Sequence, residues 1–121
     1  MTTRTILVVD DDAVLRTTAR TLLVRNGFRV LEASDGLEAF KIQETENIDL
    51  WLLDICMPNC DGLEVIQRLR KENSSIPVVC MSASHGGKEM DYTKIALKFG
   101  ANARLYKPFT EEELVDVLNS I

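Results

Sequence analysis

Four strand-like runs in the sequence each end in polar side chains with useful chemistry. Asp10 and Asp11 follow the run 5–9, and Asp54 closes the run 49–54. Ser82 follows the run 76–81, and Lys107 follows the run 103–106. Short apolar runs between turn signals are typical of buried parallel strands, and the carboxyl ends of parallel strands meet at one edge of a sheet. We therefore expect these five side chains to lie together.

Each of these residues also has an ordinary structural explanation. An aspartate among residues 10–12 can be the N-cap of the next helix. Ser82 can bond to the backbone at the end of its strand, and Lys107 can be a solvated loop residue. Because all of them fall at the same predicted edge, a shared site is the better explanation.

Clustered carboxylates at one edge call for a cation. Two carboxylates about 4 Å apart repel each other by about 1 kcal/mol in water and by about 4 kcal/mol at an effective dielectric constant of 20. Mg²⁺ prefers octahedral oxygen ligands and keeps some of its waters. If Asp11 and Asp54 hold the ion, open positions remain for phosphoryl oxygens, and Lys107 and the Ser82 hydroxyl can bind the others. This set predicts phosphoryl transfer to a carboxylate nucleophile.

The elements that must position these groups alternate along the chain. We expect strands at 5–9, 28–33, 49–54, 76–81 and 103–106, each followed by a helix. Gly27 and Gly100 are expected to end helices, the second of which runs from about residue 89 to 99. Capping boxes are expected at 35–38 and 110–113, and residues 61–64 are expected to cap the third helix. The helix after Asp35 carries Leu37, Phe40 and Ile42. The alternation predicts an α/β fold with a parallel sheet, right-handed crossovers and helices on both faces.

Composition limits the other possibilities. The chain has 121 residues, which fits one domain, and 45% of them are hydrophobic without a run as long as a membrane span. The net charge of −5 disfavours nonspecific binding to nucleic acid or anionic lipid. The three cysteines, Cys56, Cys60 and Cys80, form no zinc pattern with His85. Without a secretion signal, they predict reduced thiols in the cytoplasm.

Four segments of the sequence together resemble the receiver domain of two-component response regulators, which is CheY-like. They are residues 8–11 (VVDD), 54–62 (DICMPNCDG), 81–83 (MSA) and 107–109 (KPF), in this order across nearly the whole chain. The resemblance implies a flavodoxin-like fold of five βα units, with a parallel sheet in the order 2-1-3-4-5. We expect a single receiver domain over residues 1–121, without an output domain.

The resemblance also implies roles for individual residues. Asp54 is the phosphoacceptor, which takes a phosphoryl group from a sensor histidine kinase or a histidine phosphotransfer protein. Asp10, Asp11 and Asp54 bind Mg²⁺ together with the backbone carbonyl of Cys56. Ser82 and Lys107 bind the phosphoryl group after transfer, and the Lys107–Pro108 bond is expected to be cis. The domain catalyses only its own phosphorylation and dephosphorylation, and the phosphorylated form switches binding of a downstream effector protein.

Three features depart from the family pattern. Arg104 occupies the usually aromatic switch position, so we expect it to point outward, either pairing with an acidic group of a partner or simply solvated. The segment from Ser82 to Lys107 is about three residues longer than usual, with the excess near residues 85–88. Cys56 lies where a side chain can overhang the phosphoryl group.

Two other function classes fit part of the sequence. Residues 10–14 (DDDAV) match the motif of haloacid-dehalogenase-like phosphatases, with Asp10 as nucleophile and Asp12 as acid, but Asp54 would then be an unexplained buried carboxylate. The chain could also be a pseudo-receiver, an interaction module whose binding does not depend on phosphate. Every catalytic position is filled, which favours the receiver.

Overall fold

The structure is a computed structural model that describes residues 3–57, 61–72, 74–83 and 91–121. Strands and helices alternate within these ranges: β1 (Thr5–Val9), α1 (Ala13–Arg25), β2 (Arg29–Ala33), α2 (Gly36–Thr45), β3 (Leu50–Asp54), α3 (Gly62–Lys71), β4 (Val78–Ala83), α4 (Tyr92–Phe99), β5 (Ala103–Lys107) and α5 (Glu111–Asn119). The predicted alternation is therefore confirmed.

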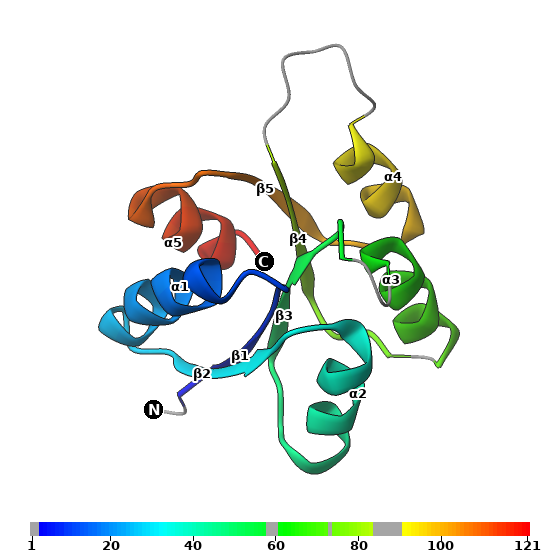
Figure 1. Cartoon of the computed structure of the whole chain (residues 1–121), viewed down its shortest axis with the longest axis horizontal. Coiled ribbons are helices and arrows are strands. Elements are labelled where there is room, and N and C mark those ends of the chain that lie inside the picture. The colour runs from blue at the N-terminus through cyan, green and yellow to red at the C-terminus, as the bar shows by residue number, and fades with distance from the viewer. Residues whose placement is uncertain (1–2, 58–60, 73, 84–90) are drawn as a thin grey trace.

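The strands form one parallel sheet in the order β2-β1-β3-β4-β5, as predicted. In Figure 1, α1 and α5 cover one face, and α2, α3 and α4 cover the other. The order in which strands are added to the sheet reverses between β1 and β3, which are parallel neighbours. Ligands bind at the carboxyl ends of the strands at this point in open α/β sheets.

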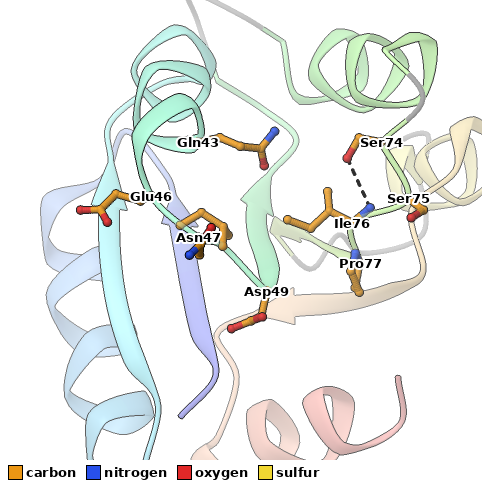
Figure 2. A pocket seen from close by; sticks show the side chains of 9 residues that line it. Gln43, Glu46, Asn47, Asp49, Ser74, Ser75, Ile76 and Pro77 are labelled. Atoms are coloured by element: carbon orange, nitrogen blue, oxygen red, sulfur yellow. Dashed lines mark hydrogen bonds between the residues drawn. The ribbon is translucent and has the colours of Figure 1, made fainter. Parts of the chain in front are cut away.

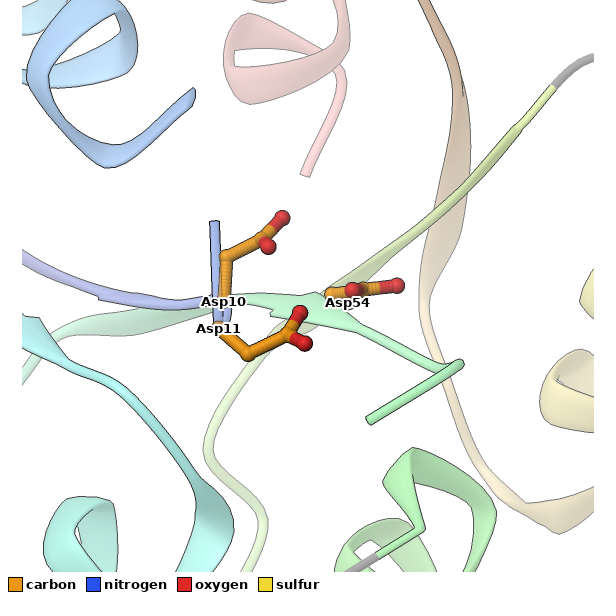
Figure 3. A group of neighbouring side chains, drawn as sticks. All are labelled: Asp10, Asp11 and Asp54. Carbon is orange, nitrogen blue, oxygen red and sulfur yellow. The ribbon is translucent and has the colours of Figure 1, made fainter. Parts of the chain in front are cut away.

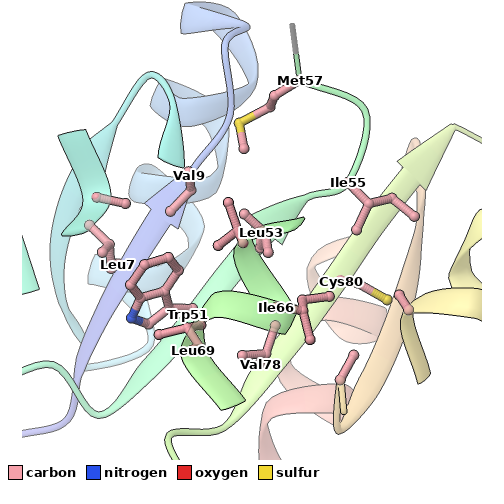
Figure 4. Packing of buried hydrophobic residues seen from close by; sticks show 14 of the residues in the cluster. Leu7, Val9, Trp51, Leu53, Ile55, Met57, Ile66, Leu69, Val78 and Cys80 are labelled. Atoms are coloured by element: carbon pink, nitrogen blue, oxygen red, sulfur yellow. The ribbon is translucent and has the colours of Figure 1, made fainter. Parts of the chain in front are cut away.

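Two apolar layers hold the helices on the sheet. The central strands β1 and β3 are buried over their whole length, so their residues alternate between the two layers. Trp51 and Leu53 pack under α2 and α3, as Figure 4 shows, whereas Leu50 and Leu52 face α1 and α5. The indole N–H of Trp51 donates to Gln43 Oε1 at 2.6 Å, which satisfies the polar atom of this buried ring.

Several predicted helix ends are confirmed. Asp12 is the N-cap of α1, where its side chain accepts bonds from two backbone N–H groups. Gly27 and Gly100 have φ values of 90° and 119°, which favour glycine after a helix. Thr110 makes the full capping box of α5. Asp35 makes only half of the predicted box, because Glu38 accepts from the Ser34 hydroxyl instead.

Other details differ from prediction. Strand β4 spans Val78–Ala83 rather than 76–81, since its ladder with β5 continues to the pair Ala83–Lys107. Leu37 is 53% exposed because the buried side of α2 runs through Gly36, Ala39 and Phe40. The described part of α4 begins at Tyr92, and the predicted helix start at 89 lies outside the described residues. The same holds for the predicted long loop at 85–88 and for Cys60.

Candidate functional site

Three aspartates meet at the carboxyl ends of β1 and β3. One carboxylate oxygen from each of Asp10, Asp11 and Asp54 lies within 4.8 Å of the others. Figure 3 shows the three carboxyl groups gathered at these strand ends. Asp10 is fully buried and Asp54 is 5% exposed, whereas Asp11 is open to solvent. The predicted convergence of these acids at one edge is confirmed.

Asp10 is held on both of its carboxyl oxygens. Its Oδ1 accepts from the backbone N–H of Asp12 at 2.9 Å, and its Oδ2 accepts from Lys107 Nζ at 2.7 Å. Burial raises the pKa of Asp10, and the charge of Asp54 adds to this rise, although the bonds from Lys107 and the Asp12 N–H oppose it. A second positive charge, such as a metal ion, would favour the ionised form of Asp10.

Lys107 reaches into the acid cluster from the end of β5. Besides its bond to Asp10, its Nζ lies 3.5 Å from Asp54 Oδ2. Burial disfavours the ammonium ion, but the bond to Asp10 and the charges of both aspartates outweigh burial and raise the pKa of Lys107. The lysine is therefore charged at neutral pH and partly offsets the acids. The next peptide bond, Lys107–Pro108, is cis, as predicted.

Ser82 and Cys56 flank Asp54. Ser82, which is 7% exposed, lies in β4 one position beyond Met81, the register partner of Asp54. The Cys56 backbone N–H donates to Asp54 Oδ1 at 3.0 Å. Burial and the charge of Asp54 raise the pKa of the Cys56 thiol, so it remains protonated at neutral pH. The backbone carbonyl of Cys56 as a metal ligand stays a prediction.

Asp12 does not join the acid cluster. Its Oδ1 accepts from the N–H groups of Val14 and Leu15 at 2.9 and 3.3 Å, which fixes the first turn of α1. This side chain is committed to capping the helix. The phosphatase interpretation therefore loses the residue that it needs as its acid.

Gly62 lets the first turn of α3 approach the end of β3. A Cβ atom at this position would lie 2.3 Å from Ile55 Cα and 2.6 Å from the Asp54 carbonyl oxygen. Such distances are far inside van der Waals contact. Only glycine therefore allows Asp54 and α3 to keep these positions.

Arg104 belongs to a polar cluster that joins β5 to the start of α4. Its Nη1 lies 3.6 Å from Asp91 Oδ2, and its side chain is 39% exposed. Tyr106 also donates to Asp91 Oδ2, at 2.6 Å, and Thr93 hydrogen-bonds the same carboxylate. Arg104 thus points outward as expected, but its acidic partner is in its own chain.

Tyr106, Asp91 and Thr93 were not among the residues predicted from the sequence. A signal was present, because Arg104 and Tyr106 are two positions apart on one strand and so share a face. Asp91 also had a recognisable role as an N-cap before an apolar helix. What could not be read from the sequence was that the two elements meet.

A hollow of about 650 Å³ lies at the opposite, amino edge of the sheet (Figure 2). Several of its polar groups are already bonded within the protein: Asp49 accepts from the Thr5 N–H, and Ser74 Oγ accepts from the Ile76 N–H. It is therefore a gap between loops, distant from the acids. Its lining comprises Gln43, Glu46, Asn47, Ile48, Asp49, Ser74, Ser75, Ile76 and Pro77.

The donor set of the acid cluster suits a hard divalent cation. All three groups offer carboxylate oxygens, which are the ligands of Mg²⁺ and Ca²⁺ rather than of zinc or copper. The exposed position of Asp11 leaves one side of the cluster open to solvent. An ion bound there could keep waters or accept oxygens of a second ligand.

Comparisons with known proteins agree with this geometry. Residues 6–119 match the family described as the response regulator receiver domain. The chain is 39% identical over 110 residues to the alkaline phosphatase synthesis transcriptional regulatory protein PhoP of Bacillus subtilis (strain 168), covering 90% of this chain and 44% of that protein. It is 40% identical over 111 residues to the response regulator MprA of Mycobacterium ulcerans (strain Agy99), covering 91% and 46%. The chain thus spans less than half the length of these curated relatives.

Solved structures give the same picture. The chemotaxis protein CheY4 of Vibrio cholerae aligns with a TM-score of 0.88 at 26% identity, over 99% of both chains. The receiver domain of the Francisella response regulator 1452 aligns with a TM-score of 0.85 at 32% identity, over 97% of this chain and 94% of that one.

In the described part of the chain, no helix is long and apolar enough to cross a membrane.

Proposed function

The chain belongs to the response regulator receiver domain family, and from this premise we propose that Asp54 is its phosphoacceptor. The observation that carries the proposal is the position of Asp54, where two further carboxylates and the ammonium group of Lys107 converge. The donor is a phosphohistidine of a sensor histidine kinase or of a histidine phosphotransfer protein. The domain acts in signalling, and its output is binding of a downstream effector protein.

In the proposed reaction, a carboxylate oxygen of Asp54 attacks the phosphorus atom of the donor. A P–O bond forms, the P–N bond to the donor imidazole breaks, and its electron pair returns to the imidazole ring. The product is an acyl phosphate on Asp54. Lys107, 3.5 Å from Asp54 Oδ2, and Ser82 at the end of the neighbouring strand are the groups that then bind phosphoryl oxygens.

Asp10, Asp11 and Asp54 would hold the cation that this reaction needs, together with the Cys56 carbonyl. Bound Mg²⁺ would neutralise charge that develops on the phosphoryl oxygens. The bonds that Asp10 accepts from Lys107 and from the Asp12 N–H favour the ionised form of Asp10 and fix the orientation of its carboxylate. The burial of Asp54 excludes most solvent from the nucleophile.

Incubation with acetyl phosphate and Mg²⁺, followed by intact-mass and peptide mass spectrometry, tests the proposal. The wild type should gain one phosphoryl group, on Asp54, and Asp54→Asn should gain none. Asp116→Asn, an exposed change on α5, is the matched control and should react like the wild type. Label on Asp10 instead would support the phosphatase interpretation.

The pseudo-receiver alternative is tested by the response of the domain to a phosphoryl mimic. Beryllofluoride with Mg²⁺ should shift amide resonances around Asp54 and Ser82 in the wild type but not in Asp54→Asn. If beryllofluoride leaves the wild-type spectrum unchanged, as it should leave that of Asp54→Asn, the domain does not respond to phosphorylation and the pseudo-receiver alternative is favoured.

A further inference from the structure

Arg16 contacts the acid cluster from α1 without belonging to it. Its Nη1 donates to the backbone carbonyl of Asp10 at 2.7 Å. The hydrogen-bonded ladder between β1 and β3 ends one residue earlier, at the pair Val9–Leu53. The carbonyl of Asp10 therefore lies past the sheet, and the guanidinium of Arg16 supplies a donor for it.

The other side of the Arg16 side chain is anchored on β2. Its Nε lies 3.4 Å from Glu32 Oε1, and Arg20 binds the second oxygen of the same carboxylate at 2.9 Å. Only 19% of the Arg16 side chain is exposed, against 51% for Arg20. Glu32 offsets part of the charge of Arg16, and the contact of Arg16 with Asp10 is a directed hydrogen bond to a backbone carbonyl, for which the planar guanidinium is suited.

The Asp10 carbonyl that Arg16 holds is part of the peptide group that leads into Asp11. Because the peptide group is planar from the Asp10 Cα to the Asp11 Cα, fixing its carbonyl oxygen also fixes the N–H of Asp11 and the position of the Asp11 Cα, from which the side chain starts. Asp11 is the exposed member of the acid cluster, and no ion pair or hydrogen bond to its carboxylate occurs among the described residues. The backbone that places its Cα therefore decides from where the Asp11 carboxylate can reach Asp54.

We propose that Arg16 is a positioning residue for cation binding: it holds the Asp10–Asp11 peptide so that the carboxylate of Asp11 faces Asp54. The inference rests on the proposed function, since it concerns the same acids. Partners that orient metal ligands typically change metal affinity by about 10- to 100-fold when they are removed. Arg16 is such a partner, acting through the backbone.

The test is the Mg²⁺ dissociation constant of the full chain, measured by isothermal titration calorimetry well below the unfolding temperature. Arg16→Gln and Arg16→Lys should both bind Mg²⁺ about 10-fold more weakly than the wild type. Lysine keeps the charge but has no planar fork, so it separates orientation from electrostatics. Arg20→Gln is the matched control: it removes the other partner of Glu32 and should leave affinity within about two-fold, because an exposed ion pair contributes little.

The outcomes decide between explanations. If Arg16→Lys binds Mg²⁺ as the wild type does, or if Arg16→Gln binds it more tightly, Arg16 acts only through charge or packing, and the inference is overturned. Should Arg16→Gln fail to fold, as judged by circular dichroism, Arg16→Lys decides alone. If the inference about Arg16 is overturned in either of these ways, the proposed function still stands, provided that Asp11→Asn loses Mg²⁺ binding. Absence of Mg²⁺ binding by the wild type would overturn the proposed function and this inference together.

Discussion

The ammonium group of Lys107 is closer to Asp10 than to the proposed phosphoacceptor: Nζ lies 2.7 Å from Asp10 Oδ2 and 3.5 Å from Asp54 Oδ2. Asp10 is fully buried, and a buried charge is costly without a partner. The lysine thus offsets the repulsion among the acids. A bound cation would share this role and leave Lys107 available to a phosphoryl group.

Replacing this lysine should make folding depend more strongly on a cation. Without the amine, Lys107→Met leaves a hydrogen bond to a buried carboxylate unmade, and we expect the free energy of unfolding in EDTA to fall by about 2 kcal/mol. Saturating Mg²⁺ should restore more stability to the variant than it adds to the wild type. Urea denaturation in EDTA and in Mg²⁺ measures both quantities, with Lys98→Met, an exposed change on α4, as control. Equal Mg²⁺ increments for the variant and the wild type would contradict this.

Asp11 should be needed for the cation but not for the fold. It is the exposed member of the acid cluster, so in EDTA the free energy of unfolding of Asp11→Asn should lie within about 0.5 kcal/mol of that of the wild type. Mg²⁺ at ten times its dissociation constant should stabilise the wild type by about 1.4 kcal/mol and leave the variant nearly unchanged. Thermal unfolding with and without Mg²⁺ checks this, and Asp116→Asn should keep the full shift. A variant that is stabilised like the wild type would exclude Asp11 as a ligand.

Asp91, the N-cap of α4, should contribute stability that is lost in acid. Hydrogen bonds from Thr93 and Tyr106 lower the pKa of Asp91 from 3.8 to about 2. Because the folded protein holds this proton less tightly than the unfolded chain, the stability from Asp91 is present above pH 4 and is lost as the pH falls toward 2. Tyr106→Phe should lower stability at neutral pH, and its gap from the wild type should narrow over this window.

Urea denaturation at a series of pH values measures that gap. Tyr92→Phe, an exposed change in α4 next to Asp91, is the control and should have the stability of the wild type at every pH. If the gap between Tyr106→Phe and the wild type stays constant between pH 4 and 2, the tyrosine does not act through the Asp91 carboxylate.

The sequence was sufficient for the strands and for the acid cluster, and the reason is physical. A buried parallel strand needs a continuous apolar run, and the parallel arrangement then brings the residues after each run to one edge. Asp10, Asp54 and Lys107 could be assembled from these two facts alone. The confirmed positions of these side chains follow from the topology rather than from any detail of packing.

Contacts between loops could not be predicted in this way. Arg70 lies near the end of α3, and its role became visible only in the structure. Its guanidinium donates to the carbonyl oxygens of Gly100, Ser74 and Ile76 and to Asn102 Oδ1. These partners lie four to 32 positions away in the sequence, and no periodicity links them. The same is true of Arg16 and Asp10, which only the fold of the turn before α1 brings into contact.

Arg70 should therefore be important for stability, unlike its neighbour Arg68. Arg70→Met leaves several carbonyl oxygens without their charged donor, and we expect a loss of about 3 kcal/mol in the free energy of unfolding. The Cζ atom of Arg68 lies 3.8 Å from the centroid of the Phe40 ring, and Arg68 pairs with Glu72 at the surface. Arg68→Met should therefore lower the free energy of unfolding by only about 1 kcal/mol. Urea denaturation of both variants gives the comparison. Equal losses would mean that the carbonyl oxygens find water when Arg70 is absent.

Gly62 should be required at the site itself, because its missing side chain makes room for the backbone of Asp54. In Gly62→Ala the added methyl group would lie 2.6 Å from the Asp54 carbonyl oxygen, so either α3 or the end of β3 must move. We expect a loss of about 1–3 kcal/mol in stability from this overpacking. A shifted Asp54 should also react more slowly, since misplacement by about 1 Å can cost about 100-fold in rate.

Gly27→Ala is the matched control for this substitution. Gly27 has a positive φ of 90°, but apart from Gly27 and its chain neighbours no heavy atom of the described residues lies within 4 Å of the position of its missing Cβ. Alanine there should destabilise the protein through backbone strain by about 1 kcal/mol while leaving Asp54 in place. Phosphorylation by acetyl phosphate, measured well below the unfolding temperature of each variant, should therefore be slowed in Gly62→Ala and unchanged in Gly27→Ala. Equal rates in the two variants would show that the contact between α3 and Asp54 does not position the nucleophile.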